Sequence, residues 1–234
     1  MQSTSQENSQ EFSDLNFIEK FPSDEFFFYL DEVGRGPLAG PVVACATSLK
    51  RTSSIEGILS CLRDLNITDS KKLTSKKRLN ILSELNIDLR NLKEKVVYEL
   101  FDGAIHFCVN SASVCEIDEI NILQASLLAM KRSINCIVRE KKIEKSVALI
   151  DGNKVFEVDN CQTYSLVKGD SKSLLIALAS IIAKEYRDEM MAQFSIIYPG
   201  YGFEKHSGYP TVFHKAQIAT LGVSDIHRRS FKLT

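Results

Sequence analysis

The stretch FFFYLDEVGRGPLAGPVVACA, residues 26–46, decides how this sequence folds. Its apolar ends predict two buried strands, Phe26–Leu30 and Val42–Ala46, and the Gly/Pro-rich segment between them is short enough for the strands to pair side by side. The first strand stops on Asp31 and Glu32. Adjacent like charges raise the electrostatic energy unless a cation compensates them, so the pair raises the question of which cation does so.

The composition is that of an ordinary globular protein. The chain has 234 residues, of which 44% are hydrophobic and 25% charged, and this suits one large domain or one domain with an appendage. No window approaches the ~18 uninterrupted apolar residues of a membrane span, and the N-terminus lacks a secretory signal. The six cysteines are scattered without a CxxC motif. We therefore expect a cytoplasmic protein with reduced thiols rather than a zinc site or a disulfide framework.

The chain divides into a polar tail and one domain. Residues 1–24 are rich in Ser, Gln, Asn and Glu and predict a disordered or loosely attached segment. Residues 25–234 combine strands with helical patterns and predict an α/β fold, in which a helical extension begins at about residue 195. Helices are expected at 74–86, 119–141, after the Gly-Asp-Ser turn at 169–171, where Asp170 or Ser171 is a candidate cap, and at 210–220.

Three apolar strands stop on an acidic residue. The first ends at Asp31 and Glu32, the second at Asp151 in ALIDG, and the third at Asp170 in SLVKGD. If these strands belong to one sheet, their ends can converge, and the carboxylates then repel one another unless divalent cations neutralise them. Oxygen ligands favour Mg²⁺ or Mn²⁺ over zinc. Two such ions would suit a nuclease that displaces a phosphoryl group.

A simpler interpretation stays open on this evidence, because Asp often begins a turn. The metal hypothesis also has a geometric difficulty. Neighbouring residues of a regular strand face opposite ways, so Asp31 and Glu32 can share a site only if the backbone turns there, as the following glycines permit.

Six segments resemble bacterial ribonuclease HII in their order and approximate spacing. They are LDEVGRGPLAGPVVA, DSKKLTSKKR, LIDGN, VKGDSKS with ASIIAKEYRD, YPGYGFEKHSGYPT and IHRRSF, and together they extend from about Phe26 to Phe231. The resemblance implies an RNase H-like fold with a mixed five-stranded sheet flanked by helices. It also implies endonucleolytic cleavage of RNA in RNA–DNA hybrids and on the 5′ side of single ribonucleotides in duplex DNA, leaving a 3′-hydroxyl and a 5′-phosphate.

The resemblance also implies roles for individual residues. The catalytic and metal-binding carboxylates of the family match Asp31, Glu32, Asp151 and Asp170. The segment that contacts the 2′-hydroxyl at the RNA–DNA junction matches Gly34, Arg35 and Gly36, the tyrosine that packs on the adjoining deoxyribose matches Tyr209, and a phosphate-contacting segment matches Lys71 and Lys72.

Two positions qualify the match. Asp188 fits a family motif but lies inside a predicted helix, and we interpret it as structural. Tyr29 stands where the family usually has Gly, so its side chain requires repacking around that strand.

Two rival functions remain: a non-catalytic nucleic-acid-binding protein of the same fold, and another RNase H-like nuclease of the resolvase or integrase type. The retained carboxylates argue against the first, and the Gly-Arg-Gly turn with SGYPT argues against the second.

Basic residues gather at 69–78 and after Tyr201, although the net charge is −1. Each cluster fits either contact with phosphates or a solvated surface. The expected partners are RNA–DNA hybrid, ribonucleotide-containing duplex DNA and two divalent ions, Mg²⁺ or Mn²⁺. We expect a monomer without membrane contact, and nothing in the sequence supports a polymerase-clamp partner.

Overall fold

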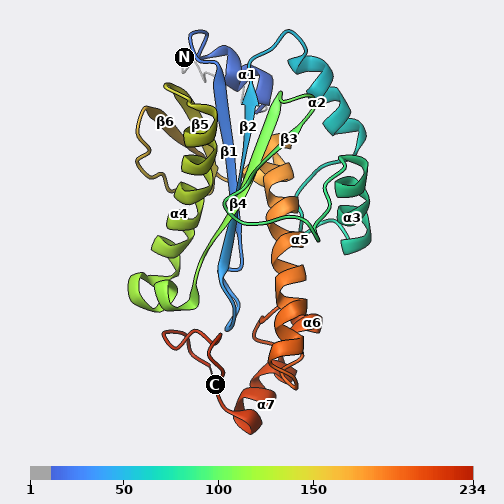
Figure 1. Cartoon of the computed structure of the whole chain (residues 1–234), viewed down its shortest axis with the longest axis vertical. Coiled ribbons are helices and arrows are strands. Elements are labelled where there is room, and N and C mark those ends of the chain that lie inside the picture. Colours follow the sequence, from blue (N-terminus) through green and yellow to red (C-terminus); the bar gives the residue numbers. More distant parts are fainter. Residues whose placement is uncertain (1–11, 234) are drawn as a thin grey trace, which may run out of the picture.

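The computed structural model describes residues 12–233 and is built around one mixed sheet (Figure 1). The strand order is β3-β4-β2-β1-β5-β6, with β1 antiparallel to β2 and parallel to β5. The strands are β1 (Phe26–Val33), β2 (Val42–Lys50), β3 (Val97–Leu100), β4 (Ile105–Ala112), β5 (Ser146–Asp151) and β6 (Cys161–Leu166).

The sheet confirms the expected α/β fold but has six strands instead of five. The short edge strand β3 is difficult to recognise in the sequence, because only Leu100 of its four residues is buried and its apolar pattern is weak. A tight turn with positive φ at Phe101, Asp102 and Gly103 folds β3 back onto β4.

Strand β1 continues beyond its predicted end at Leu30. Asp31 pairs with Cys45 and Glu32 with Ala44, so both acids lie within the regular ladder. Alternation along β1 places Tyr29 against one face of the sheet and Leu30 against the other. The backbone therefore does not turn between the two acids, and their side chains start on opposite faces.

Helices cover both faces of the sheet (Figure 1). Helix α4 (Val114–Lys141) packs on one face, where its buried residues form one core cluster with Phe28 and Leu30. Helix α5 (Leu174–Ile197), with α2 (Ile55–Asp64) and α3 (Ser75–Glu84), covers the other. Helix α4 begins earlier than expected because Ser113 and Glu116 form a capping box, and non-helical dihedral angles at Asn121 kink it.

The expectation of a loosely attached tail is wrong for its described part. Residues 1–11 lie outside the described range, but helix α1 (Asp14–Glu19) packs against the core. Phe17 is buried and its ring lies 6.4 Å from that of Tyr29. The bulky side chain at Tyr29 is thus accommodated under α1, and this apolar contact compensates the entropy of ordering the segment.

The C-terminal residues form a separate small core at one end of the molecule (Figure 1). Helices α6 (Phe203–His206) and α7 (Val212–Leu221) follow α5 there, which confirms the predicted helix at 210–220 to within two residues. Within residues 12–233, no helix combines the length and apolar character that crossing a membrane requires.

Candidate active site

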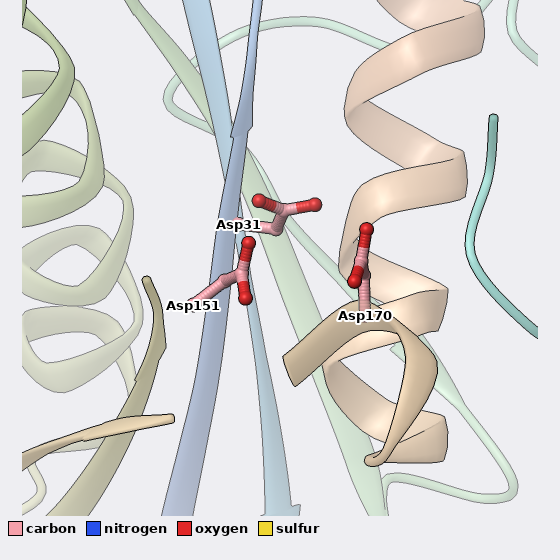
Figure 2. A group of neighbouring side chains, drawn as sticks. All are labelled: Asp31, Asp151 and Asp170. Carbon is pink, nitrogen blue, oxygen red and sulfur yellow. The ribbon is translucent and has the colours of Figure 1, made fainter. Parts of the chain in front are cut away.

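Three of the four predicted carboxylates lie close together in the structure, two from neighbouring strands and one from the turn before α5. Asp31, Asp151 and Asp170 each place one oxygen so that all three oxygens lie within 4.8 Å of one another. Figure 2 shows these side chains directed toward a common space between β1 and the start of α5. None of the ion pairs within residues 12–233 includes any of the three, so the cluster is acidic without a directly paired cation.

The topology explains this convergence. Strands β1 and β5 are parallel neighbours, so Asp31 and Asp151 come to the same edge of the sheet. Asp170 lies in a 3₁₀ turn, Gly169–Ser171, directly before α5. The amide of Gly169 donates a 2.6 Å hydrogen bond to Asp151 Oδ1 and ties the turn to the end of β5.

The helix cap is provided by neither of the predicted residues. Ser173, rather than Asp170 or Ser171, accepts the hydrogen bond from the amide of Ile176 and begins α5. Because the capping hydroxyl comes from Ser173, the carboxylate of Asp170 is available to the acidic cluster.

Burial and mutual repulsion raise the proton affinity of the cluster. Burial, with the charges of Glu32 and Asp151, raises the pKa of Asp31 well above its ordinary value. Burial and the charge of Asp151 also raise the pKa of Asp170. Both pKa shifts arise mainly from burial, and the nearby carboxylates add to them. A divalent ion would relieve this cost.

Glu32 stands apart from the three aspartates. Its Oε1 lies 3.4 Å from Arg35 Nη1 in a partly exposed ion pair. Burial raises the pKa of Glu32 to about 6, with Arg35 opposing the shift and Asp151 adding to it. Glu32 is therefore within the field of the cluster, but the structure does not bring its oxygens into the three-aspartate group.

The glycine turn after β1 is fixed by two buried arginines. Gly34 has φ of 94°, and a Cβ there would lie 2.3 Å from Arg187 Nε, so both conformation and packing require glycine. Arg228 donates to the carbonyl oxygens of Gly34 at 2.6 Å, Arg35 at 3.1 Å and Gly40 at 2.9 Å. The C-terminal segment thereby holds the turn.

Arg187 joins the turn region to the segment that precedes Tyr209. It donates hydrogen bonds to the carbonyl oxygens of Ala39, Pro41 and Ser207 at 2.9–3.0 Å. Burial lowers the pKa of Arg187 to about 10 and that of Arg228 to about 9, and both remain cationic near neutral pH. Arg228 was included among the basic residues able to meet phosphates, and that expectation is wrong because its side chain is fully buried.

Tyr209 lies beside the glycine turn. A Cβ on Gly36 would be 3.6 Å from Tyr209 Cε1, which is ordinary van der Waals contact. The amide of Leu38 donates a 2.8 Å hydrogen bond to the carbonyl of Gly208. The Tyr209 side chain is 38% exposed, so it is not a core residue and part of it faces solvent.

The basic stretch at 69–78 separates into two kinds of residue. Lys71 and Lys72 are exposed. Burial of part of Lys71 lowers its pKa, but the charges of Asp31 and Asp170 outweigh this and the net shift is upward. Arg78, by contrast, is buried and holds the loop through Glu185, at 2.5 Å, and the carbonyl of Ser70, at 2.8 Å. The inclusion of Arg78 in a phosphate-binding cluster is wrong, because its side chain is buried and paired with Glu185.

Asp188 lies outside the acidic group and has internal partners. Its Oδ1 accepts from Lys184 Nζ at 2.6 Å and from Ser207 Oγ at 2.8 Å. The structural interpretation of Asp188 agrees with these contacts.

Sequence reasoning missed the positioning roles of Arg187 and Arg228. A signal for them was present, since a Gly/Pro-rich turn between buried strands leaves carbonyl groups that need buried donors. The two arginines stand in the YRD and HRR segments, where their distance in sequence from the turn concealed the contact.

Comparison with known proteins agrees with this geometry. The family model described as Ribonuclease HII matches residues 30–234. Proteins named Ribonuclease HII from Marinomonas sp. (strain MWYL1) and Nitrosomonas europaea are 39% and 41% identical, covering 92% and 86% of this chain and 94% and 80% of theirs. The crystal structure of ribonuclease H2 from Pyrococcus horikoshii OT3 is similar in fold, with a TM-score of 0.61 and 24% identity over 89% of this chain and 94% of that one. The chain belongs to the ribonuclease HII family of type 2 ribonucleases H.

Proposed function

We propose that this ribonuclease cleaves RNA in RNA–DNA hybrids and the bond on the 5′ side of single ribonucleotides in duplex DNA. The observation that carries the proposal is the group of Asp31, Asp151 and Asp170 oxygens, which lie within 4.8 Å of one another. The strand that carries Asp31 leads into a glycine turn that Arg228 holds by hydrogen bonds. Hydrolysis would leave a 3′-hydroxyl and a 5′-phosphate.

The donor set fits divalent cations. All three converging groups offer carboxylate oxygens, the ligands that Mg²⁺ and Mn²⁺ prefer, and their repulsion is relieved by positive charge. We assign Asp31, Asp151 and Asp170 to a two-ion site, with Glu32 as a fourth ligand that must turn from Arg35 to join them. When bound, two such ions supply an activated water and stabilise the oxygens of an in-line displacement.

The protein's own groups would orient the substrate around this site. The turn Gly34–Arg35–Gly36 lacks side-chain bulk at two of its three positions, so backbone groups can approach a ribose closely. The Tyr209 ring lies next to this turn, in the place from which it can pack on the following deoxyribose. Lys71 and Lys72 extend the site with positive charge for phosphates.

A cleavage assay with one embedded ribonucleotide tests the proposal. The protein is incubated with a labelled duplex that contains a single ribonucleotide, in Mg²⁺ and in EDTA, and the cut is mapped at nucleotide resolution. We expect a single cut on the 5′ side of the ribonucleotide, in Mg²⁺ alone. An all-DNA duplex of the same sequence is the control. Cleavage of that control, or equal cleavage in EDTA, would contradict the proposal.

The proposal requires nucleic acid and divalent ions as its partners. A single chain carries every residue assigned above, so we propose that the monomer is the active form and that it acts in the cytoplasm. Elution at 26.3 kDa in size-exclusion chromatography would support the monomer.

A further inference from the structure

A chain of polar contacts runs through the C-terminal core to the backbone of Tyr209. His214 Nδ1 lies 2.9 Å from the carbonyl oxygen of Tyr209, and His214 Nε2 lies 3.1 Å from His227 Nε2. At the other end, the amide nitrogen and the hydroxyl of Ser224 lie 3.0 Å and 2.8 Å from His227 Nδ1. All four ring nitrogens therefore have a partner.

The two ends of this chain permit one arrangement of protons. A carbonyl oxygen only accepts, so His214 Nδ1 carries the hydrogen and donates it to Tyr209. An amide N–H only donates, so His227 Nδ1 is unprotonated and its hydrogen is on Nε2. His227 then donates to the unprotonated Nε2 of His214. The partner at each end of the chain thus requires the same direction for the central hydrogen bond, from His227 Nε2 to His214 Nε2.

The surroundings keep both imidazoles neutral. His214 and His227 are almost fully buried, and burial lowers the pKa of both, that of His227 to about 4. The ring of His206 stacks on His214 at 4.5 Å, and the ring of Phe203 packs against it edge-on at 5.4 Å. A second proton on His214 would place two N–H groups against each other at the central contact, and a second proton on His227 would face the amide N–H of Ser224.

Tyr209 is thus held from two sides. On one side the preceding residues, Ser207 and Gly208, are bonded to Arg187 and to the amide of Leu38. On the other side His214 holds the carbonyl of Tyr209 itself. The side chain is left between them with one edge toward Gly36 and the rest partly exposed.

We propose that His214 is a positioning residue for substrate selection: its Nδ1–H sets the backbone of Tyr209, and His227, oriented by Ser224, fixes the tautomer that makes this bond possible. The inference rests on the proposed function, in which the Tyr209 ring packs on the deoxyribose after a ribonucleotide. It adds residues that do not touch the substrate but determine how precisely the ring is presented.

The test measures selectivity rather than activity alone. The readout is the ratio of kcat/KM on a duplex with one embedded ribonucleotide to kcat/KM on a uniform RNA–DNA hybrid, in which the cleaved strand offers no deoxyribose for the ring. His214→Leu keeps a buried side chain of similar size but removes the donor, and should lower the ratio about tenfold, because small displacements of a positioning group are costly. His214→Asn is the matched control. Its amide can replace Nδ1–H, and the ratio should stay within about twofold of wild type.

A double-variant cycle separates positioning from general damage. Without the Tyr209 ring there is nothing for His214 to present, so adding His214→Leu to Tyr209→Ala should change the ratio by less than about twofold. A purely structural histidine would reduce cleavage of both substrates and add its effect to that of Tyr209→Ala.

The outcomes distinguish the inference from the function beneath it. If Tyr209→Ala lowers the ratio but His214→Leu leaves it unchanged, or lowers it further in the double variant, the inference fails and junction sensing by Tyr209 stands. If Tyr209→Ala leaves the ratio unchanged, Tyr209 does not sense the junction, and the inference about His214 is then also wrong.

A measurement on the wild-type protein is independent of whether the variants fold. Nitrogen-15 spectra of the histidine rings at pH 7 should show the hydrogen on Nδ1 of His214 and on Nε2 of His227. The opposite assignment for either ring would overturn the proposal.

Discussion

The acidic cluster and the C-terminal arginines both bring charge into the protein, but they differ in how that charge is satisfied. Asp31 and Asp170 are buried, and each has its pKa raised by burial and by neighbouring carboxylates. Arg187 and Arg228 are buried too, yet each donates three hydrogen bonds to backbone carbonyls. The acidic cluster keeps like charges close together despite their repulsion, whereas each arginine is hydrogen-bonded to the dipoles of backbone carbonyl groups.

This difference indicates that the acidic cluster serves the reaction, whereas the arginines position the backbone. A fold retains mutually repelling carboxylates at a cost in stability, which makes such a cluster a candidate for function. Arginines that are buried and hydrogen-bonded to backbone carbonyls are not accessible to a substrate and serve to fix the backbone around them. Substitutions in the two regions should therefore have opposite consequences for activity and for stability.

Asp31→Asn gives the largest expected effect, on activity. The change removes a ligand and a charge while preserving shape, so kcat should fall by about 10³-fold or more if the ions supply the nucleophile and stabilise charge. Relief of repulsion should at the same time raise the free energy of unfolding at pH 7 by about 1 kcal/mol. Cleavage kinetics in Mg²⁺ and urea denaturation measure the two quantities.

Asp188→Asn is the control for this prediction, because Asp188 is bonded to Lys184 and Ser207 rather than to the cluster. Its effect on kcat should be much milder. Near wild-type cleavage by Asp31→Asn, or an equal loss in both variants, would show that the metal ligands are wrongly assigned.

Arg228→Met should have the opposite effect, because it should mainly lower the free energy of unfolding. It leaves the buried carbonyls of Gly34 and Gly40, and the partly buried carbonyl of Arg35, without their donor, and the cost should be about 3–5 kcal/mol in the free energy of unfolding. Arg229→Ala is the matched control, since Arg229 is exposed and its amide bond to Asp118 survives the change. That variant should stay within about 0.5 kcal/mol of wild type. Equal free energies of unfolding in the two variants would contradict the role of Arg228 in holding the glycine turn.

Asp14→Asn tests a third kind of buried charge, at the N-terminal helix. Asp14 accepts hydrogen bonds from Ser173 Oγ at 2.5 Å and the amide of Leu174 at 2.8 Å, yet burial raises its pKa from 3.8 to about 6. The folded state therefore binds the proton more tightly than the unfolded chain. This group's contribution to stability falls as pH rises from about 4 to about 6, by about 3 kcal/mol for a shift of about two units.

The asparagine variant lacks this titration and keeps one of the two acceptor oxygens, and the cost of losing the other does not depend on pH. Its free energy of unfolding, minus that of wild type, should rise between pH 4 and pH 7 when both are followed by denaturant titration. A difference that is flat, or that falls with pH, would show that the charge of Asp14 is compensated in the fold.

Much of the fold was predictable because its signals are local. Apolar runs that stop on Asp31 and Asp151 indicated strands that end at the same side of the sheet, and parallel pairing of β1 with β5 brings these two acids together. The third run was predicted to stop on Asp170, but β6 ends at Leu166 and Asp170 lies in the turn that follows. The position of Glu32 was harder to predict. Whether it joins Asp31 depends on whether β1 turns after Leu30, and pairing with β2 keeps the strand regular.

The sequence could not show which polar residues are buried. Arg78 and Lys71 belong to the same basic stretch, but Arg78 finds Glu185 on a distant helix and Lys71 stays exposed. Asp14 resembles the rest of a polar tail until α5 supplies its two donors. These assignments depend on contacts between residues more than 100 positions apart, which no local pattern encodes.

Lys71→Ala with Lys72→Ala has the smallest expected effect and tests the part of the basic stretch that is free to bind phosphates. Both side chains are exposed, and the net pKa shift of Lys71 reflects its nearness to the acidic cluster where the substrate would lie. Each phosphate contact contributes about one unit to the slope of log Kd against log salt, so the double variant should bind duplex more weakly and lose up to about two units of slope. Fluorescence anisotropy at several salt concentrations, in EDTA to prevent cleavage, provides the slope. Lys20→Ala, at an exposed lysine that ends α1, should leave it unchanged. If the double variant keeps the wild-type slope, Lys71 and Lys72 belong to an ordinary solvated surface and the phosphates are bound elsewhere.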